Sequence, residues 1–309
     1  MTEHQEKLKR IISNIESVFL GKRNVVEMML IATIAKGHVL IQDVPGVGKT
    51  SLASALSKSL DASFKRIQFT PDTTPSDVIG FSMYNMDTGS FSYMKGAVLN
   101  NIVLADELNR TSPKTQAALL EVMEEYQVTV DGTTHPVPSP FMLIATQNPY
   151  EQYGTYPLPE SQLDRFMMTI SVGYPVEEVA AQIVQNSSKK PNIEPVTNIQ
   201  EILSMQQSAQ KVFISKDICE YIVRIAVETR NNPYLQTGIS TRGTLLLTAA
   251  AKGRAFINNR DFVIPDDIID LAQPVCAHRL ILNSEGKAKR LSSEEILKNI
   301  LKEVKVPLA

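Results

Sequence analysis

One short stretch restricts the possible folds of this chain more than any other, and it reads Asp43-Val44-Pro45-Gly46-Val47-Gly48-Lys49-Thr50. It follows an apolar run, His38–Ile41, that predicts a short buried strand. Apolar positions at helical spacing come directly after it, from Leu52 to Leu60. Its two glycines permit backbone conformations and close approaches that a side chain would block. Because such a turn aims backbone amides and a helix N-terminus at an anion, we expect a phosphate-binding loop here.

Within this loop we expect Lys49 to reach the terminal phosphates of a nucleotide and the Thr50 hydroxyl to bind Mg²⁺. The expected nucleotide-binding residues are Asp43, Val44, Pro45, Gly46, Val47, Gly48, Lys49, Thr50 and Ser51. The phosphate-loop pattern begins with glycine, whereas this chain has Asp43 at that position. Aspartate tolerates some of the conformations that such a turn requires. A chance glycine-rich turn is the alternative interpretation.

Two acidic residues follow directly on a second apolar run, Ile102–Ala105, which predicts a strand covered on both faces. A carboxylate at the carboxyl end of a buried parallel strand lies in the ligand crevice. We therefore expect Asp106 to bind Mg²⁺, directly or through water, and Glu107 to activate the attacking water as a general base. A role in capping or turn formation is the alternative for this acid pair.

Three further polar residues stand where they could contact the phosphates. Asn148 follows the predicted strand 141–146 and could hold the attacking water or the terminal phosphate, although a turn before Pro149 would also use an asparagine. Arg165 precedes the last predicted core strand, and Arg242 opens a helix of the second half. Both could stabilise phosphate charge as bidentate cations. Their spacing alone leaves open whether they do this or form ordinary ion pairs.

The order of these elements predicts two domains. Strand and helix patterns alternate in the first part, which implies a parallel sheet with helices on both faces. Helical spacing dominates afterwards, so we expect an α/β nucleotide-binding core over residues 1–175 and an all-helical domain over residues 176–309. A β-hairpin is expected over residues 127–137. The adenine is expected near Val18–Lys22, which stand just before the core.

Composition narrows the classes of function. The chain has 309 residues, of which 43% are hydrophobic, so it can build a sizeable core. Its 31 basic and 33 acidic residues give a formal charge of −2, which does not support a dominant role in binding nucleic acid or an anionic membrane. No apolar run reaches the ~18 residues of a membrane span, so we expect no membrane insertion. Two distant cysteines, Cys219 and Cys276, favour the reducing cytoplasm.

Longer strings of the sequence resemble the MoxR family of AAA+ ATPases, in the helix-2-insert group. The matching strings are LIQDVPGVGKT (40–50), FTPDTTPSDVIGF (69–81), ADELNRTSPKTQAALLEVMEE (105–125), ATQNP (145–149), YGTYPLPESQLDRF (153–166), STRGTLLLTAAAKGRAF (240–256) and FVIPDDI (262–268). They extend over nearly the whole chain, and aspartate at the first loop position is ordinary for this family. The resemblance implies a P-loop core with a five-stranded parallel sheet of strand order 5-1-4-3-2 and a C-terminal helical lid.

The same resemblance implies roles for individual residues. Lys49, Thr50, Asp106 and Glu107 match the Walker motifs, and Asn148 matches the first sensor. These assignments agree with the chemistry expected from the loop and from the acidic pair. The cofactors implied are ATP or ADP together with Mg²⁺.

The resemblance also implies roles for two arginines and two hairpins. Arg165 matches the arginine finger, which acts on nucleotide bound to the neighbouring subunit, and Arg242 matches the second sensor on the lid. We expect ATP between the sheet and the lid, with Arg242 coupling the nucleotide state to the lid angle. The helix-2 insert is expected around residues 81–95, and the hairpin at 127–137 is similar to the pre-sensor hairpin. Both hairpins project toward the pore in related ring-shaped machines.

The resemblance implies a homo-oligomeric ring, a hexamer by analogy, that hydrolyses ATP at subunit interfaces. Members of the family act as chaperone-like remodelers or maturation factors for protein clients, often with a protein that carries a von Willebrand factor A domain. One alternative is a chelatase-like motor subunit for metal or cofactor insertion. A nucleic-acid motor and a nucleotide-switched binding module with negligible turnover are two further alternatives.

Overall fold

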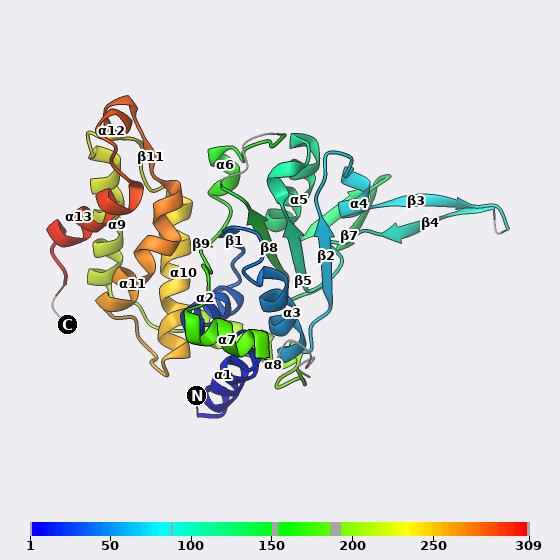
Figure 1. The fold of residues 1–309 in the computed structure, drawn as a ribbon, viewed down its shortest axis with the longest axis horizontal. Coiled ribbons are helices and arrows are strands. Elements are labelled where there is room, and N and C mark those ends of the chain that lie inside the picture. Colours follow the sequence, from blue (N-terminus) through cyan, green and yellow to red (C-terminus); the bar gives the residue numbers. More distant parts are fainter. Residues whose placement is uncertain (1, 88, 150–153, 186–192, 308–309) are drawn as a thin grey trace.

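A five-stranded parallel sheet forms the centre of the first half of the chain (Figure 1). The computed structural model describes residues 2–87, 89–149, 154–185 and 193–307. The strands of the sheet are β1 (Val39–Gln42), β2 (Phe64–Gln68), β5 (Ile102–Asp106), β8 (Met142–Gln147) and β9 (Met168–Ile170). They lie in the order β2-β5-β8-β1-β9, and all neighbours are parallel. Counted among the core strands alone, this is the order 5-1-4-3-2, so the prediction is confirmed.

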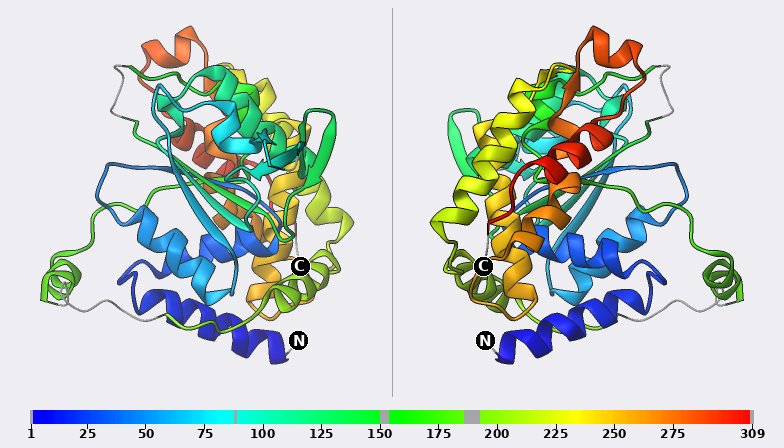
Figure 2. Two further views of the ribbon diagram at one scale, coloured as in Figure 1. Left: turned by 90° about the vertical axis from the view of Figure 1, so that its right-hand side faces the viewer. Right: turned by 90° about the vertical axis from the view of Figure 1, so that its left-hand side faces the viewer.

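Helices cover both faces of the sheet, and β5 and β8 are therefore buried along nearly their whole length. Side chains alternate between the two faces along each strand. On β1, Val39 and Ile41 belong to one apolar cluster, whereas Leu40 belongs to another. The first cluster includes α1 (Thr2–Glu16), α2 (Arg23–Ile34) and α3 (Lys49–Ser59), and the second includes α4 (Pro75–Ile79) and α5 (Pro113–Glu125). Figure 2 shows the strands between these two helical layers.

The start of α5 follows from the local sequence. Ser112 adopts extended backbone angles, and its hydroxyl accepts a hydrogen bond from the amide of Thr115 at 3.4 Å. Pro113 occupies the first helical position, where its missing N–H costs nothing. The helix ends at Glu125, and the following residue, Tyr126, has a positive φ of 52° that turns the chain toward the next strand. Serine and proline therefore fix the residue at which this helix begins.

Two antiparallel hairpins extend from the core. The first pairs β3 (Gly80–Asn85) with β4 (Ser90–Lys95), and the second pairs β6 (Gln127–Val130) with β7 (Thr133–Pro136). The β3–β4 hairpin projects far from the sheet (Figure 1) and exposes large apolar side chains, among them Met86 and Phe91. Where the hairpins meet, the rings of Tyr93 and His135 stack with centroids 3.9 Å apart. Both hairpins lie where the sequence predicts them.

The second half of the chain is mostly helical. Its helices are α7 (Glu177–Gln185), α8 (Ile199–Gln210), α9 (Lys216–Asn231), α10 (Thr241–Ile257), α11 (Pro265–Cys276), α12 (Ser284–Ala288) and α13 (Ser293–Glu303), with the 3₁₀ turn η2 (Ala277–Arg279) after α11. The 3₁₀ turn η1 (Leu108–Arg110) and α6 (Glu160–Leu163) precede β9 and belong to the first half. A short antiparallel pair, β10 (Leu235–Thr237) with β11 (Ile281–Leu282), departs from the expected all-helical pattern. Strands of three and two residues are too short to produce a recognisable alternation.

The lid helices pack directly on the core. α10 crosses α2, and a methyl group added at Gly253 would come within 3.3 Å of the carbonyl oxygen of Ile31. Leu30 of α2 and Leu247 of α10 belong to one continuous apolar cluster. The two halves therefore share a hydrophobic core. Over the residues that the structure describes, no helix has both the length and the apolar character needed to span a bilayer.

Asp267 provides a test of the lid packing. Its carboxylate is 1% exposed and accepts hydrogen bonds from Arg260 Nη1 at 2.7 Å and from the amide of Ile264 at 3.0 Å. We predict that Asp267→Ala lowers the free energy of unfolding by about 3 kcal/mol, because it leaves buried donors without an acceptor. The exposed neighbour Asp266 is the matched control, and Asp266→Ala should stay within about 0.5 kcal/mol. Urea denaturation measures both, and equal losses would contradict the prediction.

Candidate functional site

The glycine-rich loop lies between β1 and α3, at the carboxyl edge of the sheet. Gly46 and Gly48 have φ of +87° and +89°, in the left-handed region that favours glycine. A methyl group at Gly48 would come within 3.1 Å of the Phe19 ring. The loop borders a cavity of about 340 Å³, and its lining residues are Pro45, Gly46, Gly48, Lys49, Thr50, Arg66, Gln68, Asp106, Glu107 and Asn148. The first turn of α3 therefore starts at the cavity, as an anion site requires.

The backbone of the loop holds the Lys49 side chain in place over the loop. Its Nζ donates a hydrogen bond to the carbonyl oxygen of Asp43 at 2.8 Å. Burial lowers the pKa of Lys49, while the nearby charges of Asp106, Asp43 and Glu107 act in the opposite direction. The ammonium group thus stands among acidic groups, in the position from which it could reach a phosphate.

Asp43, which stands where the phosphate-loop pattern has glycine, ties the loop to the end of β9. Its Oδ2 accepts hydrogen bonds from the amides of Val172 and Gly173, both at 2.6 Å, and from the Ser171 hydroxyl at 3.0 Å. Its Oδ1 accepts one from the amide of Val44 at 2.8 Å. Burial alone would raise the pKa of Asp43, but these hydrogen bonds outweigh burial and leave the pKa below its usual value. The carboxylate therefore performs a structural task that glycine could not.

Asp106 ends β5 and has both carboxylate oxygens engaged. Thr146 donates to Oδ1 at 2.6 Å, and Arg66 donates to Oδ2 through Nε at 3.1 Å and Nη2 at 2.7 Å. No motif in the sequence singles out Arg66. Arg66 and Gln68 alternate along β2, but only the strand register, which sets Gln68 beside Asp106, reveals that they face the acidic strand. Two polar residues therefore lie on one face of β2, next to the strand that ends in Asp106.

Glu107 and Asn148 border the same cavity as Lys49. Glu107 has a positive φ of 56°, and its amide donates to the Thr146 hydroxyl at 2.9 Å. Its Oε2 accepts a hydrogen bond from Arg110 Nη1 at 3.0 Å. A carboxylate and an amide side chain beside a phosphate loop can together hold and polarise a water molecule.

The metal-ligating residues expected from the sequence, Thr50 and Asp106, meet at this cavity. Mg²⁺ prefers oxygen ligands and is usually held by one or two carboxylates together with phosphate oxygens. Within the described ranges, no group of three or more His, Cys, Asp or Glu side chains could hold a metal ion. One hydroxyl and one carboxylate fit an ion that enters together with nucleotide phosphates.

Arg165 and Arg242 lie elsewhere. Arg165 donates to the carbonyl oxygen of Leu120 at 2.7 Å, and its Nη2 lies 3.1 Å from Glu124 Oε2. Arg242 forms an ion pair with the other oxygen of Glu124. Arg165 precedes β9, and the amide of nearby Met167 donates to the carbonyl oxygen of the residue before β1. Arg165 therefore lies at the amino edge of the sheet, and Arg242, which shares Glu124 with it, lies at the same edge. The four residues of β1 separate this edge from the phosphate loop by ~13 Å.

The segment expected to approach the adenine, Val18–Lys22, lies beside the loop and α7. Phe19 is buried against Gly48, and a methyl group at Gly21 would come within 2.9 Å of a Val179 methyl. Lys22 Nζ donates to the carbonyl oxygen of Tyr174 at 2.8 Å. The phosphate loop and α7 thus both contact this segment.

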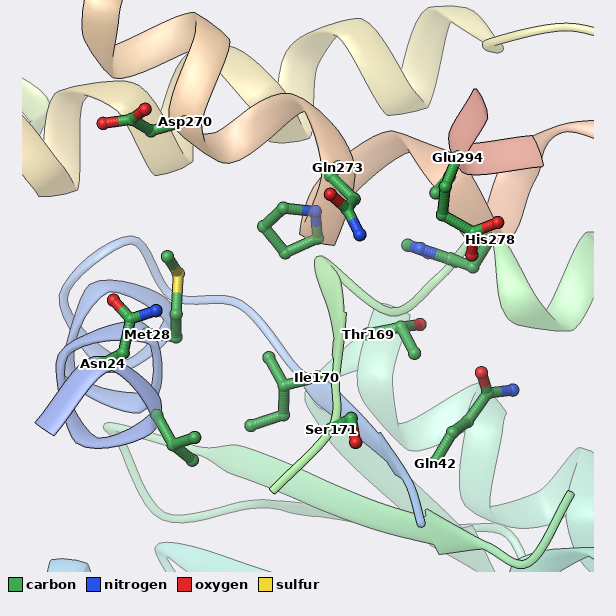
Figure 3. Close-up of a pocket in the computed structure, with 13 residues that line it drawn as sticks. Asn24, Met28, Gln42, Thr169, Ile170, Ser171, Asp270, Gln273, His278 and Glu294 are labelled. Carbon is green, nitrogen blue, oxygen red and sulfur yellow. The ribbon is translucent and has the colours of Figure 1, made fainter. Parts of the chain in front are cut away.

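A larger cavity, of about 500 Å³, lies between α2, β9 and α11 (Figure 3). Figure 3 shows Thr169 and His278 on one side of it and Asn24 with Met28 on the other. Thr169 Oγ1 and His278 Nδ1 have no hydrogen-bond partner within the described part of the chain. Burial lowers the pKa of His278 to about 3, so this ring is neutral at physiological pH. None of the site residues expected from the sequence lines this cavity, so its size does not make it the candidate site.

Comparisons with known proteins agree with the geometry. The family model of ATPases associated with various cellular activities (AAA) matches residues 38–168, and the AAA lid domain model matches residues 227–300. Chaperone MoxR1 of Mycobacterium tuberculosis is 38% identical, over 97% of this chain and 82% of the relative. The Bacillus subtilis protein YeaC is 49% identical, over 97% of this chain and 95% of the relative. A crystal structure from Cytophaga hutchinsonii has a TM-score of 0.93 at 39% identity, covering 99% of this chain and 97% of that one.

Asp43 allows a test of how the loop is anchored. We predict that Asp43→Asn lowers the free energy of unfolding at pH 7 by about 2 kcal/mol, because charge-assisted hydrogen bonds to three amides and a hydroxyl weaken. Since the pKa of Asp43 is lowered from 3.8, its contribution is present above pH 3.8 and is lost as the pH falls through the folded-state value.

Chemical denaturation at a series of pH values measures this difference between the wild type and Asp43→Asn. The exposed Asp72 is the control, and Asp72→Asn should differ little from the wild type at every pH. A difference for Asp43→Asn that stayed constant below pH 3.8 would show that the carboxylate charge is not what holds the loop.

Proposed function

Because the chain belongs to the MoxR family of AAA ATPases, we propose that it hydrolyses Mg·ATP at seams between neighbouring copies of itself. Membership makes it an ATP hydrolase. One observation carries the proposal. Lys49 and Glu107 border the phosphate cavity, whereas Arg165 and Arg242 lie at the opposite edge of the sheet. A head-to-tail arrangement brings the arginines of one subunit to the phosphates of the next.

Within one subunit, the loop amides and Lys49 take the phosphates. Thr50 and Asp106 would hold Mg²⁺, which would supply positive charge to offset that of the phosphates. Arg66 already neutralises Asp106, so this carboxylate alone offers little net charge to a free cation. We propose that the ion therefore enters with the nucleotide. We propose that adenine is held near Val18–Lys22, where Gly21 packs closely against the apolar side chain of Val179.

We assign the chemical step to Glu107, Asn148 and the arginines of the neighbouring subunit. Glu107 accepts a proton from the attacking water, and Asn148 orients that water. Arg110 contacts Glu107 and fixes the direction of its carboxylate. Arg165 from the adjacent subunit stabilises charge that develops on the terminal phosphate, with Arg242 beside it. We propose that Arg242 acts across the seam, because it shares Glu124 with Arg165.

At the level of the assembly, we propose a closed ring, a hexamer by family analogy, with a core over residues 1–175 and a lid over residues 176–309. Chaperone MoxR1 is named as a chaperone, and we propose that this chain likewise remodels protein clients. The exposed apolar side chains of the β3–β4 hairpin support client contact, since water-exposed apolar surface marks binding sites. A protein with a von Willebrand factor A domain is the proposed partner.

Glu107→Gln tests the role of the general base. We predict that ATP binding is retained while turnover falls by about 10²–10⁴-fold, because the amide cannot accept the proton of the water. A fluorescent ATP analogue measures binding, and phosphate release measures turnover. Glu121→Gln, on the exposed face of α5, is the control and should hydrolyse ATP at the wild-type rate. Wild-type turnover in Glu107→Gln would remove Glu107 from this role.

Arg165→Ala tests the seam. We predict a loss of turnover on the order of 10³–10⁵-fold with ATP binding retained, since the lost cation acts on another subunit's phosphate. Mixing this variant with Lys49→Ala should restore part of the activity, because intact arginines then meet intact phosphate loops. Wild-type activity per subunit should also fall on dilution below the assembly concentration. Strictly monomeric protein that hydrolyses ATP as fast as the assembly would refute the proposal.

A further inference from the structure

Arg279 is the most deeply buried guanidinium near the seam. It is 5% exposed, lies in η2 after α11, and has no place in the proposed chemistry. Its Nε donates to Asp164 Oδ1 at 2.9 Å, and its Nη2 donates to the carbonyl oxygens of Asp164 at 3.0 Å and Phe166 at 2.6 Å. It also donates to the carbonyl oxygen of Val275 in the preceding helix, α11. One lid side chain thus holds the backbone on both sides of Arg165.

Asp164 also binds the first turn of α10. The Ser240 hydroxyl donates to its two carboxylate oxygens at 2.9 and 3.1 Å. The same hydroxyl accepts a hydrogen bond from the amide of Gly243 at 2.9 Å, which makes Ser240 the N-cap of the helix that carries Arg242. Asp164 therefore receives bonds from two separate lid elements, and each of the two arginines lies within two residues of this contact.

Gly243 packs closely against the side chain of Arg279. A methyl group at Gly243 would come within 2.9 Å of Arg279 Cδ and 3.1 Å of its Nε. Such distances are too short for unrelaxed packing, so the start of α10 leaves room for the guanidinium stem. Burial lowers the pKa of Arg279, which is the expected cost of removing a cation from water. Because apolar side chains can often replace a buried ion pair without loss of stability, stability alone does not require a cation at this position.

We infer that Arg279 is a positioning residue that, through Asp164 and Ser240, aims Arg165 and Arg242 as a pair at the neighbouring subunit's phosphates. The two arginines converge on Glu124, where Arg165 Nη2 lies 3.1 Å from one carboxylate oxygen and Arg242 pairs with the other. Their spacing is set by the contact of Asp164 with the lid. The inference rests on the proposed function, because it concerns the same seam.

A variant with badly aimed arginines should lose turnover without losing affinity for ATP. Arg279→Lys keeps the charge but loses the planar fork that reaches several acceptors at once. The phosphate cavity contains none of these residues, so KM for ATP should stay within about twofold of the wild type. Turnover should fall on the order of 10²-fold, the effect of a small misplacement of groups that act on the reacting atoms. Arg224→Lys, at a surface ion pair with Glu220, is the matched control and should be neutral.

Mixed assemblies provide the decisive readout. Subunits with Lys49→Ala lack the phosphate contact but carry an intact arginine pair. When they are mixed with Arg279→Lys, the intact phosphate loops of the latter meet correctly aimed arginines, and turnover per Arg279→Lys subunit should rise at least about tenfold, part of the ~10²-fold loss. Mixing Arg279→Lys with Arg165→Ala should give no rise, because neither variant supplies a working pair.

The mixture of Arg165→Ala with Lys49→Ala tests the proposed function separately from the positioning role of Arg279. If it recovers activity and the Arg279→Lys plus Lys49→Ala mixture does not, the positioning role is overturned while the proposed function stands. If the Arg165→Ala mixture fails to recover, the seam itself is wrong. Circular dichroism and ATP binding check the folding of each variant. Should Arg279→Lys not fold, Ser240→Ala removes the second bond to Asp164, and its mixture with Lys49→Ala must then recover or the inference fails.

Discussion

The parallel direction of the five strands is the constraint on which the rest of this molecule depends. Because all carboxyl ends meet at one edge, residues that follow strands gather there, although they are far apart in the sequence. Lys49, Asp106 and Asn148 come together for this reason. A residue that precedes a strand is carried to the other edge, as Arg165 is. One subunit therefore carries the phosphate loop and Arg165 at opposite edges of the sheet, which is the geometry on which the proposed head-to-tail assembly depends.

Acidic side chains hold the loops of this fold in place, and each does so through different partners. Asp43 is stabilised by amides at the end of β9, whereas Asp106 is neutralised by Arg66 from β2. Asp164 is paired with a buried arginine from the lid, and Asp267 with Arg260. In every case the donors come from a neighbouring element, so a carboxylate fixes the distance between two parts of the chain. The loop, the arginine pair and the lid are thereby positioned relative to the sheet.

Most of the fold and the phosphate side of the site could be predicted from the sequence. The glycine loop, the buried strand before Asp106 and the capped start of α5 at Ser112 are local patterns, each set by a few adjacent residues. The pairing β10–β11 was not predictable, since its strands are too short to show a period. Arg66 and Arg279 were not identified either, because their partners lie 40 and 115 residues away.

The sequence by itself determined that a phosphate loop stands between a strand and a helix, because glycines, a lysine and a threonine at fixed spacing encode that turn locally. It could also name Arg165 and Arg242, but it left open whether they contact phosphate or form ion pairs. Only the tertiary structure decided that both meet at Glu124, on the edge opposite the loop. The physical reason is that the direction of a side chain in space depends on how distant strands and helices pack, and no local spacing specifies that packing.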